Sequence, residues 1–277
     1  MNRLIAFVSV LLLATMSVFA QHESDSIFIE RVLKEAPHDA GTLYFAQKFL
    51  GRPYVAHTLE VNEIEQLVVN TRELDCTTLV ENAVALTLCR KQNKLTFGDF
   101  CYLLCQLRYR SGIIDGYPSR LHYFTDWILD NSRMGYVQEI QLEKAPFSRV
   151  QTIQVNFMST HPQAYKALKN NHDFVSDIIR QEKQLSGRKF RYIPKSEIKN
   201  TKQLRSIIHD GDILAITTSK AGLDIAHLGF AVWRKDGLHL LNASQLHHKV
   251  VEEPMTFSQY LSKHSSHTGV RVVRLKE

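Results

Sequence analysis

The spacing of apolar residues changes along the chain, and this change limits the possible folds more than any other sequence feature. In the first half, apolar residues recur every three or four positions, as on the buried face of a helix. In the last third, short apolar runs of strand length replace this pattern. Helices followed by an antiparallel sheet predict an α+β fold. The expected helices span 27–33, 43–50, 76–88, 97–107 and 121–129, with one more opening at 161–162 and a successor around 174–179, and the expected strands span 212–216, 225–233, 238–243 and 270–275.

The second and third expected strands are predicted to form a hairpin, because the Asp-Gly dipeptide at 236–237 favours a tight turn between strands. A four-residue loop would place Gly229 opposite Asn242 on the neighbouring strand. A two-residue loop would instead place Ala231 opposite Asn242. Side chains alternate between the faces of a sheet, so in both registers Asn242 shares a face with His227.

The N-terminus has the pattern of a secretory signal peptide. A short basic start precedes an apolar run at 4–18, and small residues end at Ala20. We therefore expect residues 1–20 to be removed and residues 21–277 to form a single domain in the periplasm or outside the cell. A retained membrane anchor is the alternative. No other run is long and apolar enough to span a bilayer.

The charge distribution gives no indication of a nucleic-acid partner. The formal net charge is +6, and it becomes +5 once Arg3 is removed with the signal peptide. The basic residues form no run with interleaved aromatic residues, which a nucleic-acid surface would show. An exported basic protein is instead expected to be attracted to anionic cell-wall polymers.

Cys76 is the strongest candidate for chemistry. The sequence Asp-Cys-Thr-Thr at 75–78 places it in the first turn of an expected helix, after the N-cap residue Asp75. The partial positive charge of a helix N-terminus favours a thiolate, and its free N–H groups suit an oxyanion. The alternative is that Cys76 is a small core residue. The remaining cysteines are expected in the core and show no metal-binding or redox spacing: Cys89, Cys101 and Cys105.

A nucleophilic cysteine needs a base and a group that orients the base. His227 is the best-placed histidine, because its neighbours on the same strand face, Gly229 and Ala231, leave room for another element. Asn242 can accept a hydrogen bond from its imidazole and fix the tautomer. The alternative for His227 is a half-exposed strand residue without chemistry.

In these residues the chain resembles the NlpC-type cell-wall cysteine amidases and peptidases. These are papain-like enzymes that act on peptidoglycan. Asn242 stands where many members carry histidine, and Thr-Thr follows the cysteine where many carry Ser-Gly. With these two differences, the chain resembles one branch of these enzymes, the N-acetylmuramoyl-L-alanine amidase-like family. The segments that carry the resemblance are 51–54, 75–78, 211–213, 226–230 and 241–244, with 119–123 and 156–162 for the branch.

The resemblance implies a papain-like NlpC fold in which N-terminal helices carry the nucleophile and pack on a C-terminal antiparallel sheet. It also implies helical insertions around 97–185 that narrow the cleft. By resemblance the catalytic residues are Cys76 as nucleophile, His227 as base and Asn242 as orienting residue. The implied substrate-binding residues are Tyr54, which helps to shape the oxyanion site, and Arg120 and His122. For the last two, solvated polar residues at a helix start are the alternative.

The function that the resemblance implies is hydrolysis of the amide between N-acetylmuramic acid and L-alanine in peptidoglycan fragments or muropeptides. One alternative is the same machinery cutting the γ-D-glutamyl–diamino acid bond. Another is a wall-binding module without activity. A zinc amidase is disfavoured, because the chain lacks His-Glu-x-x-His and adjacent His247 and His248 would point to opposite faces of a strand. No metal or other cofactor is expected.

Overall fold

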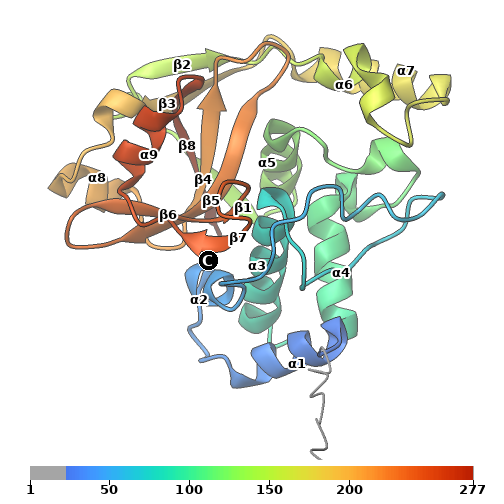
Figure 1. The fold of residues 1–277 in the computed structure, drawn as a ribbon, viewed down its shortest axis with the longest axis horizontal. Coiled ribbons are helices and arrows are strands. Elements are labelled where there is room, and N and C mark those ends of the chain that lie inside the picture. Colours follow the sequence, from blue (N-terminus) through green and yellow to red (C-terminus); the bar gives the residue numbers. More distant parts are fainter. Residues whose placement is uncertain (1–22, 277) are drawn as a thin grey trace, which may run out of the picture.

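The fold is taken from a computed structural model that describes residues 23–276. The expected signal peptide at 1–20 lies outside these residues, and the single domain at 21–277 stays a prediction. The described chain combines helices with an antiparallel sheet, so the α+β prediction is confirmed (Figure 1). No helix within 23–276 is long and apolar enough to cross a membrane.

The helices of the first half agree with the expected ones to within a few residues. The α-helices are α1 (Asp25–Glu35), α2 (Thr42–Gln47), α3 (Cys76–Lys91), α4 (Phe97–Arg108), α5 (Phe124–Arg133), α6 (Phe157–Thr160), α7 (His172–Leu185), α8 (Lys202–Ile207) and α9 (Phe257–Lys263). Short 3-10 helices are η1 (Arg110–Gly112), η2 (Tyr117–Ser119), η3 (Pro162–Ala164) and η4 (Lys195–Glu197).

The sheet has the strand order β2-β3-β8-β4-β5-β6-β7, and β1 also pairs with β8. All these pairings are antiparallel. The strands are β1 (Val137–Ile140), β2 (Arg149–Thr152), β3 (Lys189–Pro194), β4 (Ile213–Thr218), β5 (Ile225–Trp233), β6 (Leu238–Ser244), β7 (Lys249–Glu252) and β8 (His267–Leu275).

Helices cover both faces of the sheet, so the central strands β4 and β6 are buried along almost their whole length. On β5, Leu228 and Phe230 face one core together with α1 to α5, whereas Ala231 faces a second core together with α8 and α9. Figure 1 shows α8 and α9 on one side of the sheet and α3 and α4 on the other. Successive residues of β5 therefore point into two different cores, one on each face of the sheet.

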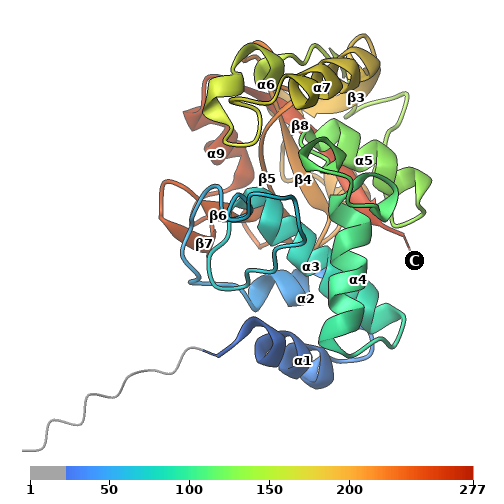
Figure 2. The same cartoon turned by 90° about the vertical axis from the view of Figure 1, so that its right-hand side faces the viewer.

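Helix α3, which begins at Cys76, is buried almost all round. It lies beside α4 and the sheet, and Figure 2 shows α4 in front of it with α1 and α2 at its lower end. Its start is fixed by a capping box in which Asp75 and Thr78 each accept a backbone hydrogen bond from the other. The helix that carries Cys76 thus has one defined position relative to β5.

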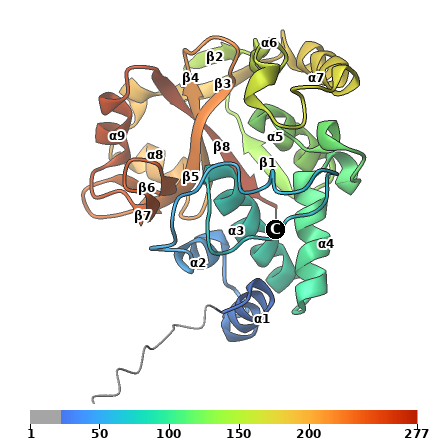
Figure 3. The same ribbon diagram turned by 45° about the vertical axis from the view of Figure 1, so that its right-hand side comes forward.

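The segment after residue 155 differs from the sequence prediction. The helix expected to open at His161-Pro162 is wrong: only the 3-10 turn η3 forms there, after the single turn of α6. His161 precedes a proline, which disfavours helical backbone at that residue. A helix follows only at α7, where Asn171 caps the backbone N–H of Phe174. Figure 3 shows α6 and α7 at the end of the molecule opposite α1.

Candidate active site

Cys76 lines a cavity of about 180 Å³ between the start of α3 and the start of β5. His227 and His122 line the same cavity. The thiol is contributed by a helix and the imidazole of His227 by the strand packed beside that helix. The structure therefore brings the expected nucleophile and base into one cavity.

The Cys76 thiol is protonated in the resting site. Burial, together with the Asp75 carboxylate, raises the pKa of Cys76 to about 12. Hydrogen bonding from the Leu228 backbone and the Thr77 side chain opposes this rise in pKa without overcoming it. The expectation that the helix N-terminus ionises Cys76 near neutral pH is therefore wrong for the resting site, because desolvation by burial outweighs it. Cys76 needs a base before it can attack.

His227 is oriented by a hydrogen bond that joins its Nε2 to Oδ1 of Asn242 at 2.8 Å. The other side-chain atom of Asn242, Nδ2, donates to Oε1 of Glu253 at 2.9 Å. A carboxylate oxygen accepts, so the Asn242 amide must turn its N–H₂ to Glu253 and its oxygen to His227. Nε2 of His227 then carries the proton, and Nδ1 is the ring nitrogen able to receive one.

The neutral form of the His227 imidazole is favoured at neutral pH. Burial lowers its pKa, while the hydrogen bond to Asn242 and the charge of Glu253 oppose that lowering. A neutral imidazole can take the thiol proton, and the same two neighbours stabilise the imidazolium that results.

Gly229 allows the close approach that the His227–Asn242 contact needs. A Cβ atom at Gly229 would lie 2.5 Å from the backbone oxygen of Leu241 and 3.0 Å from Cβ of Asn242. The hairpin has the four-residue loop, with Trp233 opposite Leu238. The first of the two registers considered from the sequence is therefore the correct one.

Glu253 was not identified from the sequence. Its side chain is only 1% exposed, and besides Asn242 it contacts Nε2 of His247 at 3.2 Å. Glu253 follows β7 directly, and its backbone N–H donates to Leu240 on β6. Nothing in the local sequence marks this glutamate as buried, because its partners Asn242 and Leu240 lie on the preceding strand β6.

Tyr54 lies near Cys76. Burial raises its pKa, and the charges of Cys76 and Asp75 add to the rise, which places the phenol within electrostatic reach of both. Its backbone is held in place, since the N–H of Tyr54 donates to the carbonyl of His248 at 3.0 Å and Tyr54 bridges to Leu74.

His122 and Arg120 face different cavities. His122 lies in the cavity of Cys76, where burial and the nearby Arg120 charge lower its pKa to about 3. Its Nε2 is 2.9 Å from the carbonyl of Tyr117, whose ring also packs on the imidazole at 4.4 Å. Because a carbonyl only accepts, Nε2 carries the proton and the ring is held as a neutral donor.

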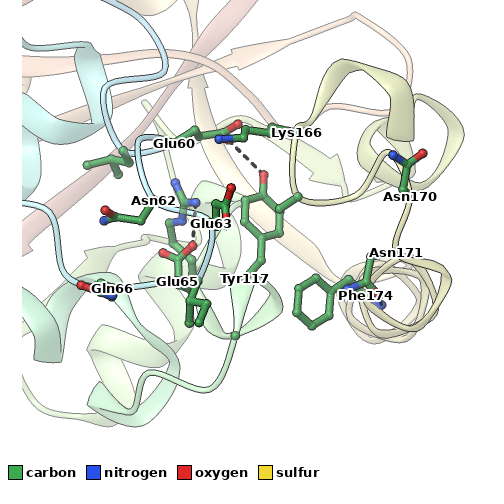
Figure 4. A pocket seen from close by; sticks show the side chains of 15 residues that line it. Glu60, Asn62, Glu63, Glu65, Gln66, Tyr117, Lys166, Asn170, Asn171 and Phe174 are labelled. Carbon is green, nitrogen blue, oxygen red and sulfur yellow. Dashed lines mark hydrogen bonds and ion pairs between the residues drawn. The ribbon is translucent and has the colours of Figure 1, made fainter.

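Arg120 instead lines a larger neighbouring cavity of about 410 Å³. Its guanidinium is buried, pairs with Glu65 at 3.0 Å and lies over the ring of Tyr117. Figure 4 shows Tyr117 near the centre of this cavity, within hydrogen-bond distance of Glu60 and close to Phe174. The lining also includes amide side chains, which are Asn62, Gln66, Asn170 and Asn171, and the basic side chain of Lys166. The two cavities meet at the Tyr117–His122 pair.

No group of three or more histidine, cysteine, aspartate or glutamate side chains in the described part of the chain is arranged to hold a metal ion. The cysteines of this part are all free thiols.

Residues 44–270 match the N-acetylmuramoyl-L-alanine amidase-like family. A solved N-acetylmuramoyl-L-alanine amidase from Bacteroides uniformis is 40% identical, and the match covers 89% of this chain and 100% of that one with a TM-score of 0.79. A Bacteroides fragilis protein provisionally named a xylanase is 43% identical over 84% of this chain and 99% of its own, with a TM-score of 0.78.

A Legionella pneumophila protein shares the fold, with 22% identity, a TM-score of 0.67 and coverage of 90% of this chain and 92% of its own. Comparison with curated proteins gives no significant match. Because the family match extends over most of the chain, the chain belongs to the N-acetylmuramoyl-L-alanine amidase-like family.

Proposed function

We propose that this protein is an exported cysteine amidase that hydrolyses the amide between the lactyl group of N-acetylmuramic acid and L-alanine in peptidoglycan fragments. The proposed triad is Cys76, His227 and Asn242. The observation that carries the proposal is the 2.8 Å hydrogen bond that orients His227 in a cavity shared with Cys76. Membership of the amidase-like family supports the bond type. Export rests on the sequence pattern of residues 1–20.

In the proposed mechanism, Nδ1 of His227 takes the thiol proton of Cys76 as sulfur attacks the lactyl carbonyl. The backbone N–H of Cys76 and the hydroxyl of Tyr54 are the proposed donors to the oxyanion. Collapse of the tetrahedral intermediate breaks the C–N bond, and the imidazolium protonates the departing amine of L-alanine. Water, deprotonated by His227, then hydrolyses the thioester and restores the thiol.

We also propose that the fold of this chain is related to that of the papain-like NlpC hydrolases. It is supported by the placement of the thiol at the start of α3 and of the imidazole on β5, with the orienting amide on β6. Asn242 in place of a histidine is compatible with this role, because an amide oxygen also accepts the imidazole N–H.

The cavity at Tyr117 supports a substrate that carries a sugar. Amide and carboxylate side chains can bond sugar hydroxyl groups, and the aromatic rings of Tyr117 and Phe174 offer faces for its apolar side. His122 lies between this cavity and Cys76. A muramoyl ring in this position would place its lactyl group toward the thiol.

The decisive experiment uses a defined N-acetylmuramoyl tripeptide and mass spectrometry of the products. We expect free L-alanyl peptide and N-acetylmuramic acid, and no products from Cys76→Ala. Cleavage of a sugar-free peptide at the γ-D-glutamyl bond at an equal rate would favour the endopeptidase alternative. No cleavage of either substrate would favour a binding module.

A further inference from the structure

Asp224 is a buried carboxylate in the cavity of Cys76 that has no part in the mechanism above. It is only 3% exposed and comes directly before β5, three residues ahead of His227. The other described side chains that line this cavity are apolar or uncharged polar, apart from His122 and His227, whose lowered pKa values keep both rings neutral at neutral pH. Asp224 therefore gives the lining of this cavity its one fixed charge.

The orientation of Asp224 is fixed on two sides. Its Oδ2 accepts a hydrogen bond from the backbone N–H of Thr125 at 2.6 Å, in the first turn of α5. The N-cap residue of α5, Tyr123, makes no side-chain cap, so Asp224 supplies from a distant segment the acceptor that a capping residue normally provides. The backbone carbonyl of Asp224 accepts from the side chain of Gln151 at 2.6 Å. The carboxylate thus has one defined position.

The second carboxylate oxygen of Asp224, Oδ1, is open to the cavity. It accepts no hydrogen bond from residues 23–276, and it is not among the atoms of these residues that are both enclosed and unpaired. The guanidinium of Arg271 bonds the Thr125 hydroxyl and pairs with Glu139 rather than with Asp224. A carboxylate can accept about four hydrogen bonds, and a buried charge without partners is unfavourable. Oδ1 therefore favours a ligand that brings a hydrogen-bond donor.

The donor nearest to the thiol on the proposed substrate is the N–H of the amide under attack. The carbonyl oxygen of that amide must face the oxyanion donors, and its nitrogen must face His227, which shares the cavity with Asp224. A cavity of about 180 Å³ has room for little more than the lactyl and alanyl groups that flank this bond. We propose that Oδ1 of Asp224 accepts this N–H and that Asp224 is a further catalytic residue. This inference rests on the amidase function proposed above.

The hydrogen bond to Asp224 strengthens as the C–N bond breaks. His227 transfers its proton to the nitrogen, the electron pair of the C–N bond stays on nitrogen, and positive charge develops there. The N–H becomes a stronger donor, so the fixed carboxylate stabilises this state more than it stabilises the neutral amide. Asp224 itself neither gives nor takes a proton. The departing peptide, whose free amine is mostly protonated at neutral pH, keeps the same partner.

The first test compares Asp224→Asn with the wild type on an amide and on an ester. The substrates are N-acetylmuramoyl-L-Ala-D-isoGln and its analogue with L-lactate in place of L-alanine, which lacks the scissile N–H. In the variant the asparagine oxygen can still accept from Thr125, so its N–H₂ group replaces the acceptor that faces the cavity. We expect kcat/KM to fall roughly ten- to a hundred-fold on the amide and less than about three-fold on the ester. Equal losses on both substrates would overturn the inference.

Alkylation of Cys76 gives a second test that needs no substrate. Asp224 repels an anion, so the ratio of the iodoacetate rate to the iodoacetamide rate should be about ten-fold lower at Cys76 than at N-acetylcysteine amide. The same ratio should rise about ten-fold in Asp224→Asn, whereas a change in thiol ionisation affects both reagents alike. The wild-type measurement holds even if the variant does not fold. A ratio at Cys76 equal to that of the free thiol would show that no carboxylate faces the sulfur.

Asp25→Asn is the matched control. Asp25 also accepts a backbone N–H, that of Thr71 at 2.8 Å, but it lines neither the cavity of Cys76 nor the cavity at Tyr117. It should leave the alkylation ratio and both kcat/KM values within about two-fold of wild type. Cleavage of the amide with an unchanged amide-to-ester ratio in Asp224→Asn would refute the role of Asp224 and leave the amidase function intact. If the wild type cuts neither substrate, the amidase function fails and the role of Asp224 fails with it.

Discussion

Glu253 accepts a hydrogen bond from the side-chain amide of Asn242 at 2.9 Å and thereby determines which end of that amide faces His227. An asparagine alone can present either its oxygen or its N–H₂ group to a neighbour. Only the oxygen can accept the Nε2 proton of His227 and leave Nδ1 free for the thiol. The orienting unit of this site is thus a pair, Asn242 with Glu253, on the two neighbouring segments β6 and the end of β7.

Glu253→Gln should lower kcat about ten-fold with little change in KM, because a glutamine amide allows Asn242 to flip and removes a charge that stabilises the imidazolium. The acid limb of the pH profile should move to lower pH, since the Glu253 charge raises the pKa of His227. The measurement is kcat and KM on a defined muramoyl peptide between pH 4 and pH 9.

Glu252→Gln is the matched control, because Glu252 pairs with the partly exposed Arg234 and makes no contact with Asn242. It should leave kcat unchanged. A Glu253→Gln protein with wild-type kcat and an unmoved pH profile would show that Glu253 has only a structural role.

Cys76 should be the sole essential thiol. Cys76→Ala should abolish hydrolysis and leave the fold intact, whereas alanine at the other cysteines should change stability more than turnover. Cys89 is buried in the main core and does not line the cavity of Cys76. The assay is turnover with and without iodoacetamide or EDTA, with folding followed by circular dichroism. Inactivation by EDTA together with resistance to iodoacetamide would contradict a cysteine mechanism.

The reactivity of Cys76 should increase toward alkaline pH. Burial raises the pKa of its thiol to about 12, so in the resting enzyme the thiolate fraction grows about ten-fold per pH unit through the neutral and mildly alkaline range. Burial also lowers the pKa of His227, which disfavours a stable thiolate–imidazolium pair. The rate of alkylation by iodoacetamide should therefore rise steadily from pH 6 to pH 9. A plateau beginning below pH 7 would show a preformed ion pair instead.

The local patterns of the sequence predict the elements that carry Cys76, His227 and Asn242, because those elements are specified by their own residues. The cap at Asp75 predicts the start of α3, and the Asp-Gly turn with alternating apolar residues predicts the hairpin of β5 and β6. The short strands β1, β2, β3 and β7 were missed, since they have only four to six residues and their pairing with other strands is not visible in their own sequence.

The environment of the site residues could not be predicted in the same way. The position of Cys76 at a helix start suggests a lowered pKa, but the sheet that buries it comes from residues about 150 positions later and reverses the direction. Arg120 and His122 are two residues apart, yet they face two cavities because Tyr117 packs between them. The protonation of Cys76 and the cavities that Arg120 and His122 line therefore depend on tertiary packing.

The buried ion pair between Glu81 on α3 and Arg108 on α4 should dominate the stability of this helix contact. Both side chains are 2% exposed, with 2.7 Å between Nε and the carboxylate oxygen. Glu81→Leu leaves a buried guanidinium without its partner and should reduce the free energy of unfolding by about 3–5 kcal/mol. The measurement is urea unfolding.

Addition of Arg108→Met to Glu81→Leu should restore much of that loss, because an apolar pair needs no compensating charge. Lys34→Ala, which breaks the exposed pair with Glu30 on α1, is the control and should cost less than about 1 kcal/mol. If Glu81→Leu proves as mild as Lys34→Ala, the pair contributes no more than a surface contact.

The role of Asn242 can be separated from that of His227 by the size of the loss on substitution. Its amide does not titrate near neutral pH, so it orients the base without transferring a proton. Asn242→Ala leaves nucleophile and base in place but lets the imidazole rotate, and turnover should fall roughly ten- to a thousand-fold, less than in a serine triad because a cysteine is the stronger nucleophile. His227→Ala should be near background.

Asn242→His should retain more activity than Asn242→Ala, since a ring nitrogen can accept the Nε2 proton of His227 in place of the amide oxygen. Glu253 favours this substitution, because its carboxylate can hold the second nitrogen of the new ring as it now holds the amide of Asn242. Turnover on a defined muramoyl peptide, with folding verified by circular dichroism, gives the comparison. A folded Asn242→Ala protein with unchanged turnover would mean that another group orients His227 despite the 2.8 Å contact.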